Sequence, residues 1–169
     1  IMKTVRLSCA HALFKFLIAQ KTIIDGKKVA LFPGAFAIYG HGNVACLGQA
    51  MEEFQSDLPG YRGHHEQSMA LSGIGYARAM RRKQIFIATS SSGPGAMNMV
   101  TAAGVALSNR LPLLLLPGDV FASRFPDPVL QQVENFNSPV ENQNDAFKPV
   151  SRFFDRITRP EQILNSLPQ

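Results

Sequence analysis

Apolar positions along the chain recur with two spacings, one typical of amphipathic helices and one typical of buried strands. Ser8 precedes a stretch with apolar residues on one helical face, which predicts a helix capped by Ser8. That face consists of Ala12, Leu13, Phe16 and Leu17. A turn is expected at 25–28. Residues 35–39 are apolar and predict a short strand buried on both faces, and residues 44–54 return to helical spacing. These segments form a first strand–helix unit.

The same alternation continues further along the chain. Residues 66–82 predict a helix with small residues on one side, and residues 84–89 predict a strand. A helix over 95–109 and a buried strand over the leucine run 113–116 follow. Because strands alternate with helices, we expect an α/β fold, a doubly wound parallel sheet with helices on both faces.

Residues 120–150 have a different character, with four prolines, scattered phenylalanines and many Asn and Gln side chains. A stretch this long predicts an ordered surface segment over the sheet edge or against a partner. Thr158 is a predicted cap of a last helix with Pro160 in its first turn. That helix is cut short at Gln169. We therefore expect one domain, residues 1–169, truncated at its C-terminal end.

The charge of the chain argues against nucleic-acid binding. The net charge of +5 comes from 17 Lys and Arg against 12 Asp and Glu, and the one tight basic cluster is 81–83. Nucleic-acid binding requires a broader basic stripe, so this cluster is predicted to form the last turn of a helix, and no nucleic-acid partner is expected.

The cysteines and the N-terminal stretch bear on the compartment. Cys9 and Cys46 lack CxxC spacing and are expected to be buried free thiols in a reducing compartment. His11 and Lys15 interrupt the N-terminal apolar stretch, so we expect neither a signal peptide nor a membrane span. A cytoplasmic protein without a membrane partner is predicted.

Glu66 is the most informative candidate for chemistry. It opens the helix predicted over 66–82, and a glycine-rich loop over 89–98 belongs to the next strand–helix unit. In open α/β folds ligands bind at the carboxyl ends of the strands, so this pairing indicates a site for a polar heterocycle, where a carboxylate could exchange protons with a ring nitrogen. The alternative is an acid that only complements the helix dipole.

Each of the neighbouring motifs has more than one interpretation. The loop Ser92-Gly93-Pro94-Gly95 joins a strand to a helix, as a phosphate cradle would, but it matches neither GxxxxGK[ST] nor GxGxxG. A tight turn that admits another chain or a flat ligand is the second interpretation. His64 and His65 lack a third ligand at suitable spacing, so no metal site is predicted. His41 lies where a ligand contact is expected, or is satisfied by backbone.

Several motifs, in order, carry a family resemblance. The strand ending at Gly40, the run His65-Glu66-Gln67, the loop 89–98 and the strand 112–119 resemble the N-terminal, pyrimidine-binding domain of thiamine-diphosphate enzymes of the acetolactate synthase type. Residues 39–43 and 127–132 look most like members that hydrolyse a cyclic dione in inositol catabolism. Related chains are labelled malonic semialdehyde oxidative decarboxylase. Acetolactate synthase, that decarboxylase and a non-catalytic α/β binding module stay open as alternatives.

The resemblance implies roles for particular residues. The Glu66 carboxyl would bond the aminopyrimidine ring nitrogen of the cofactor and favour its imino tautomer. Two segments would line the pyrimidine or substrate side: Gly40, His41, Gly42 and Asn43, and Ser92, Gly93, Pro94, Gly95 and Asn98. Gln131 and Lys148 are further candidates on the substrate side. The loop around Pro94 then forms a wall rather than a phosphate cradle.

The resemblance also implies what other parts of the protein supply. The cofactors would be thiamine diphosphate and magnesium, but the family's Gly-Asp-Gly motif with paired asparagines, which binds magnesium and the diphosphate in a C-terminal domain, does not occur in this sequence. Family members place the two halves of the site on different subunits. We therefore expect a homodimer or a dimer of dimers with shared active sites, acting on a small molecule.

Overall fold

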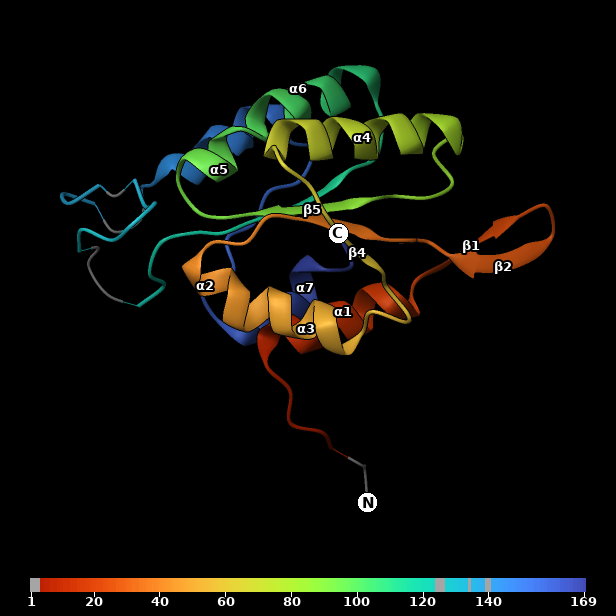
Figure 1. The fold of residues 1–169 in the computed structure, drawn as a ribbon, viewed down its shortest axis with the longest axis horizontal. Coiled ribbons are helices and arrows are strands. Elements are labelled where there is room, and N and C mark those ends of the chain that lie inside the picture. The colour runs from red at the N-terminus through yellow and green to blue at the C-terminus, as the bar shows by residue number, and fades with distance from the viewer. Residues whose placement is uncertain (1–3, 124–126, 134, 139–140) are drawn as a thin grey trace.

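The computed structural model describes residues 4–123, 127–133, 135–138 and 141–169. Within them, four parallel strands lie between two layers of helices, in the order β4-β3-β5-β6 (Figure 1). The strands are β1 (Lys21–Ile24), β2 (Lys27–Ala30), β3 (Ala35–Ala37), β4 (Gly60–Arg62), β5 (Ile87–Ser90) and β6 (Leu114–Pro117). The helices are α1 (Cys9–Ala19), α2 (His41–Asn43), the π-helical turn η1 (Val44–Gly48), α3 (Gln49–Glu53), α4 (Glu66–Ala79), α5 (Pro94–Met97), α6 (Val100–Asn109), the 3-10 segments η2 (Gln143–Val150) and η3 (Pro160–Gln162), and α7 (Ile163–Ser166). The predicted α/β fold with helices on both faces is confirmed.

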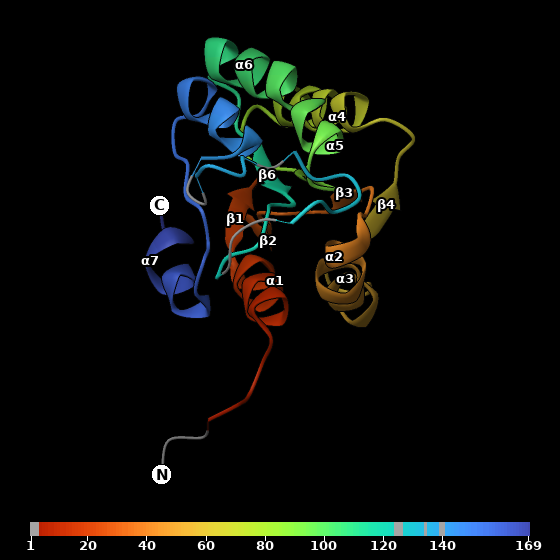
Figure 2. The same cartoon turned by 90° about the vertical axis from the view of Figure 1, so that its left-hand side faces the viewer.

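Two cores lie on opposite faces of the sheet. Figure 2 shows α4, α5 and α6 on one face and α1, α3 and α7 on the other. Phe14 and Leu58 are fully buried in the core below the sheet, where burial of such a side chain contributes about 1.5–3 kcal/mol. The core above the sheet contains many alanines, including Ala70 of α4 and Ala103 of α6, beside larger residues such as Phe147.

The helix start predicted at Ser8 is confirmed, because the Ser8 hydroxyl accepts a hydrogen bond from the backbone N–H of His11 at 3.2 Å. Within the described residues, no helix is both long and apolar enough to cross a membrane.

Three strands were not predicted. The turn expected at 25–28 is the tip of a hairpin of β1 and β2, with positive φ at Asp25 (49°) and Gly26 (76°), as the common two-residue hairpin turn requires. Strand β4 has only three residues, two of them exposed, and carries no apolar run that periodicity could detect. It nevertheless forms one edge of the sheet.

The leucine run was predicted as a buried strand, and the strand is present, but the predicted burial is wrong. Strand β6 pairs with β5 alone among the described strands, so it is an edge strand and all four of its residues are only half-buried. The run of apolar side chains identified a strand, but it did not give the strand order of the sheet.

Several predicted helices differ from the structure in extent. Helix α4 ends at Ala79, and Arg81 and Arg82 adopt positive φ values beyond it, so the basic cluster is not its last helical turn. The predicted helix over 95–109 is interrupted between α5 and α6. Arg159, not Thr158, takes the N-cap position of η3, while the Thr158 N–H and hydroxyl both donate to the side-chain oxygen of Gln162.

The prediction of buried thiols is wrong for one cysteine. Cys46 is exposed and Cys9 is half-buried, and both are free. Cys46 lies in η1, all of whose residues are at least partly exposed, which periodicity alone did not indicate.

The proline-rich segment 120–150 is described only in part, and Pro126 and Pro139 lie outside the described residues. Its last section, η2, packs against α5 and α6. The Asn144 side-chain amide donates to the carbonyl oxygen of Gly118, directly after the edge strand β6, at 2.8 Å. This section therefore lies over the sheet edge, as predicted.

Candidate functional site

Three loops meet at the carboxyl edge of the parallel sheet, where β3, β5 and β6 end. A Cβ at Gly40 would lie 2.6 Å from the Ser91 Cβ, and a Cβ at Gly118 would lie 2.7 Å from the Ser92 backbone nitrogen. The Asn43 amide donates to the backbone carbonyl of the last β5 residue at 3.0 Å. The predicted segment 40–43 is therefore held against Ser90 and Ser91, directly before the second predicted segment 92–98, and a side chain at Gly40 would prevent this.

The segment 40–43 is not the loop that its composition indicated. Gly40 is extended and precedes α2, so His41 and Gly42 belong to the first helical turn and are exposed. Asn43 is half-buried and holds this turn against β5. The cofactor-binding roles of His41 and Gly42 stay predictions.

Glu66 is the first residue of α4, but it does not cap the helix. The His65 ring nitrogen Nδ1 takes that role by accepting from the Ser68 N–H, at a long 3.4 Å. Glu66 is half-buried, and its Oε2 accepts a hydrogen bond from the Asn98 amide at 2.9 Å. Within the described part of the chain, Oε1 receives no hydrogen bond. One carboxylate oxygen is thus held and the other is available.

The free carboxylate oxygen faces the glycine loop. A Cβ at Gly95 would lie 3.0 Å from Glu66 Oε1 and would collide with the Ser91 hydroxyl, so only glycine leaves the observed space. The pairing of this carboxylate with this loop, predicted from the sequence, is present in the structure.

Gly93 has a backbone conformation that favours glycine, with φ 67° and ψ −134°. A Cβ there would collide with the carbonyl oxygen of Gln131. Pro94 then occupies the first turn of α5, where its fixed φ suits a helix start. The loop is therefore a closely packed wall.

The two candidates on the substrate side differ. Gln131 lies in the cluster, because its Oε1 is 3.2 Å from the position of a Gly40 Cβ. Lys148 lies in η2, where its ammonium pairs with Asp145 at 3.0 Å and lies 5.8 Å from the centre of the Phe154 ring. None of these contacts brings Lys148 to Glu66. We call Glu66, Asn98, Gln131 and the residues 40–43, 91–95 and 118 the Glu66 cluster.

Arg156 holds an ion cluster behind these loops that the sequence did not reveal. Its Nε donates to Asp119 at 2.9 Å, and its Nη2 donates to Asp145 at 2.8 Å. Burial acts to raise the pKa of Asp145, but hydrogen bonds from Lys148, Arg156 and the Asn142 backbone outweigh it, so that pKa lies below its ordinary value. Of these residues, Asp119 stood out in the sequence at the end of a predicted strand and Lys148 as a substrate-side candidate, whereas Arg156 and Asp145 did not.

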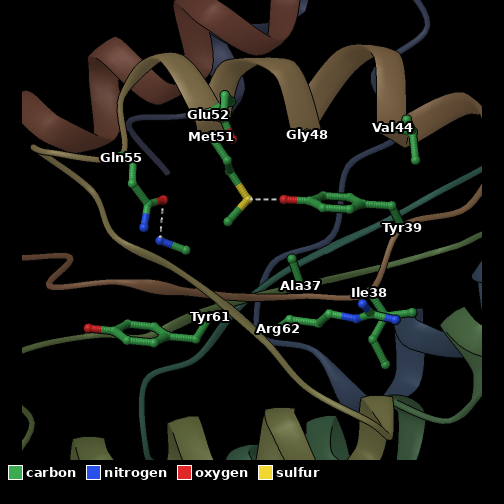
Figure 3. A pocket seen from close by; sticks show the side chains of 11 residues that line it. Ala37, Ile38, Tyr39, Val44, Gly48, Met51, Glu52, Gln55, Tyr61 and Arg62 are labelled. Carbon is green, nitrogen blue, oxygen red and sulfur yellow. Dashed lines mark hydrogen bonds between the residues drawn. The ribbon is translucent and has the colours of Figure 1, made fainter.

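A separate groove of about 700 Å³ lies between β4 and α3 (Figure 3). Figure 3 shows Tyr39 and Met51 pointing toward each other, and the Tyr39 hydroxyl donates to the Met51 sulfur at 2.8 Å. Burial, with a smaller effect of the Glu52 carboxylate, raises the pKa of Tyr39. The residues that line the groove are Ala37, Ile38, Tyr39, Val44, Gly48, Met51, Glu52, Gln55, Gly60, Tyr61 and Arg62. Glu66 is not among them.

The chain is similar to known proteins over nearly its whole length. Residues 34–138 match the family described as thiamine pyrophosphate enzyme, N-terminal TPP binding domain. Proteins named 3D-(3,5/4)-trihydroxycyclohexane-1,2-dione hydrolase from Geobacillus thermodenitrificans and Shouchella clausii are 52% and 53% identical to it, each over 98% of this chain and 26% of the relative. The protein of that name from Clostridium tetani is 51% identical, with the same coverage. The chain thus spans about a quarter of the length of the curated relatives it matches.

Proposed function

The chain belongs to the thiamine pyrophosphate enzymes, as their N-terminal cofactor-binding domain, and on that premise we propose that it forms the pyrimidine side of the active site of a larger enzyme. That enzyme cleaves a carbon–carbon bond next to a carbonyl, and its substrate is 3D-(3,5/4)-trihydroxycyclohexane-1,2-dione, in inositol catabolism. The names and the identity of the relatives support this substrate.

One observation carries the proposal: the Glu66 carboxylate is held through Oε2 by Asn98 and offers Oε1 beside the glycine loop. An aminopyrimidine has flat faces and ring nitrogens along its edge. At Gly93 and Gly95 the loop packs closely against Gln131 and Ser91, which places its backbone beside Glu66, and Oε1 can accept or share a proton at the ring edge. The residues present therefore fit the group.

The chain's own residues would act on proton position and on placement. When bound, thiamine diphosphate supplies a nucleophilic carbon that attacks a carbonyl and then holds the electron pair of the broken bond. Glu66 Oε1 exchanges a proton with the ring nitrogen and so sets the tautomer of the aminopyrimidine. Asn98 fixes the second oxygen, which leaves the carboxylate a single orientation toward the ring. The backbone of the loop 91–95 excludes water from that edge.

The other half of the site would come from outside this sequence. We propose that the diphosphate and magnesium bind to a C-terminal domain of a second subunit, in a homodimer or a dimer of dimers with shared sites. The exposed face of α4 supports this, because Leu71 and Gly75 present small or apolar surface that a partner could cover. The cytoplasm is the proposed compartment, since the described thiols are free.

The test is turnover by the full-length protein with thiamine diphosphate and magnesium. Three substrates are compared: the cyclic dione, pyruvate and malonic semialdehyde. We expect the dione to be consumed only when the cofactor is present. Turnover of pyruvate or malonic semialdehyde instead would favour the synthase or the decarboxylase. A protein that does not bind the cofactor would be a binding module. The isolated 169-residue chain is expected to show no turnover, because it lacks the diphosphate anchor.

A further inference from the structure

Arg156 connects two segments that have no strand pairing with each other. Its guanidinium bonds Asp119, in the loop after β6, through Nε, and it bonds Asp145 and Asn142, at the start of η2, through Nη2. About a quarter of each of the three charged side chains is exposed, so solvent only partly screens these contacts.

Both segments contact the glycine loop, residues 91–95, or the helix α5 that continues from it. The loop after β6 touches it through Gly118, whose Cα leaves room for the Ser92 nitrogen only because it carries no side chain. The segment η2, seen in blue beside α6 in Figure 1, packs against α5, which begins at Pro94. A change in the distance between the two segments would therefore move the residues that face Glu66.

The geometry requires an arginine at this position. A guanidinium is planar and presents donors along two edges, so it bonds two carboxylates at once, whereas an ammonium acts as a single point charge. Without Arg156, Asp119 and Asp145 would be two partly buried like charges, of which only Asp145 keeps a cationic partner, Lys148 at 3.0 Å. Removal of Arg156 would thus both release the two segments and push them apart.

We propose that Arg156 is a positioning residue for the candidate cofactor site: by bonding Asp119 and Asp145 together, it holds the glycine loop where Gly95 meets the Glu66 carboxylate. This inference rests on the proposed function, because it concerns the same site. The contacts with Asp119, Asn142 and Asp145 transmit its effect to the site through these two segments.

The experiment compares Arg156→Met, Arg156→Lys and Arg152→Met in the full-length protein. Arg152 is the matched control, since it is an exposed arginine in the same stretch of chain. Three quantities are measured: the thiamine diphosphate dissociation constant by equilibrium dialysis, the hydrogen exchange of residues 90–98, and the melting temperature. None of these readouts requires turnover.

We expect Arg156→Met to weaken cofactor binding about tenfold or more, since small misplacements in a site have effects of this size, and to speed exchange in 90–98. Arg156→Lys should lie between it and the parent, and Arg152→Met should match the parent. A lower melting temperature with parent-like affinity and exchange would overturn the proposal. If Arg156→Met does not fold, Arg156→Lys decides, and parent-like affinity in that variant overturns it.

Failure of the proposed function gives a different result. A parent protein that binds no thiamine diphosphate would refute the cofactor role of the Glu66 cluster. The positioning effect would then be judged by exchange in 90–98 alone, and parent-like exchange in Arg156→Met would refute that effect too.

Discussion

The groove and the Glu66 cluster differ in almost every respect. The groove has a volume of about 700 Å³ and is lined by side chains from β4, η1 and α3. The Glu66 cluster is formed by glycine backbone, one carboxylate and one amide. The groove has the volume of a small-molecule site, but none of its described lining residues is a carboxylate paired with a glycine loop. By chemistry the Glu66 cluster is the better candidate.

This difference is what we expect when two domains share one active site and the chain contains only one of them. A pocket that is closed by another domain has only one wall in the first domain, so the chemistry of that wall identifies it better than a volume does. What that wall retains is its chemistry: Glu66 with one oxygen held and one available, beside backbone that approaches closely because Gly93 and Gly95 lack side chains. Close glycine contacts around an oriented acid are more informative here than volume.

The largest expected effect comes from Glu66→Gln in the full-length enzyme. Glutamine keeps the size of the side chain but cannot exchange the proton, so turnover should fall by about 10²–10⁴-fold. Glu52→Gln is the matched control, because Glu52 is an acid that lines the groove. It should leave turnover unchanged. Both rates are measured with saturating cofactor.

Melting temperatures of the same variants separate catalysis from stability. If Glu66 only complemented the helix dipole, its replacement would cost about 0.3–1 kcal/mol of stability and no activity. Normal turnover in Glu66→Gln, or a steep loss in Glu52→Gln, would reverse the comparison between the two regions.

The second prediction contrasts two glycines. Gly93→Ala places a Cβ against the Gln131 carbonyl at a positive φ, so we expect a loss of roughly 1–3 kcal/mol in stability and weaker cofactor binding. Gly48→Ala, in the groove, places its Cβ at an ordinary 3.5 Å from the Asn43 carbonyl oxygen and should be tolerated. Denaturant unfolding and cofactor dialysis measure both effects. Equal tolerance at the two positions would mean that the wall is not closely packed.

The third prediction concerns pH and the ion cluster behind the Glu66 cluster. Because the pKa of Asp145 in the folded protein lies below the ordinary 3.8, the stability that its carboxylate contributes is full above about pH 4 and is lost as the pH falls through the folded-state pKa. Asp145→Asn should cost about 1.5–3 kcal/mol at neutral pH and flatten this acid limb. Asp57 is an exposed acid, so Asp57→Asn should change neither the stability at neutral pH nor the acid limb. Urea unfolding at pH values from about 2 to about 7, which include the range where carboxyl groups titrate, measures the stability at neutral pH and the acid limb.

The smallest expected effect comes from comparing a glycine on the exposed face of α4 with a glycine on α6. Gly75 has open space around its Cβ position, and Gly104 on α6 has only the Val150 side chain, at 3.8 Å. In an isolated chain, alanine at either position should add up to about 1 kcal/mol through helix propensity. If α4 packs closely against a second subunit, Gly75→Ala should instead weaken the assembly, while Gly104→Ala should not. Sedimentation measures the assembly and thermal unfolding measures the stability, so together they show whether each substitution stabilises the chain or weakens the assembly.

The sequence predicted what depends on local pattern. The Ser8 cap, the helix beginning at Glu66 and the alternation of strands with helices are set by neighbouring residues, so periodicity and capping rules recovered them. Strand β4 was missed because three residues carry too little pattern, and β6 was placed too deep because strand order is a tertiary property.

In the candidate site, too, the features that follow from local pattern were predicted and the tertiary contacts were not. Glu66 and the glycine loop were paired in advance because both follow from where parallel strands end. The Asn98 hydrogen bond to Glu66 gave a physical reason for a residue that only the family resemblance had selected. Arg156 was not identified, since no spacing in the sequence links it to Asp119 and Asp145. Lys148 pairs with Asp145, and its role on the substrate side stays a prediction.

A structure of the full-length enzyme with thiamine diphosphate bound tests the central claim most directly. The decisive quantity is the distance from Glu66 Oε1 to the nearest nitrogen of the aminopyrimidine ring. The account predicts a hydrogen bond of about 2.6–3.2 Å, with Asn98 still bonded to Oε2. A pyrimidine ring in the groove between β4 and α3, or a Glu66 carboxylate turned away from the ring, would contradict it.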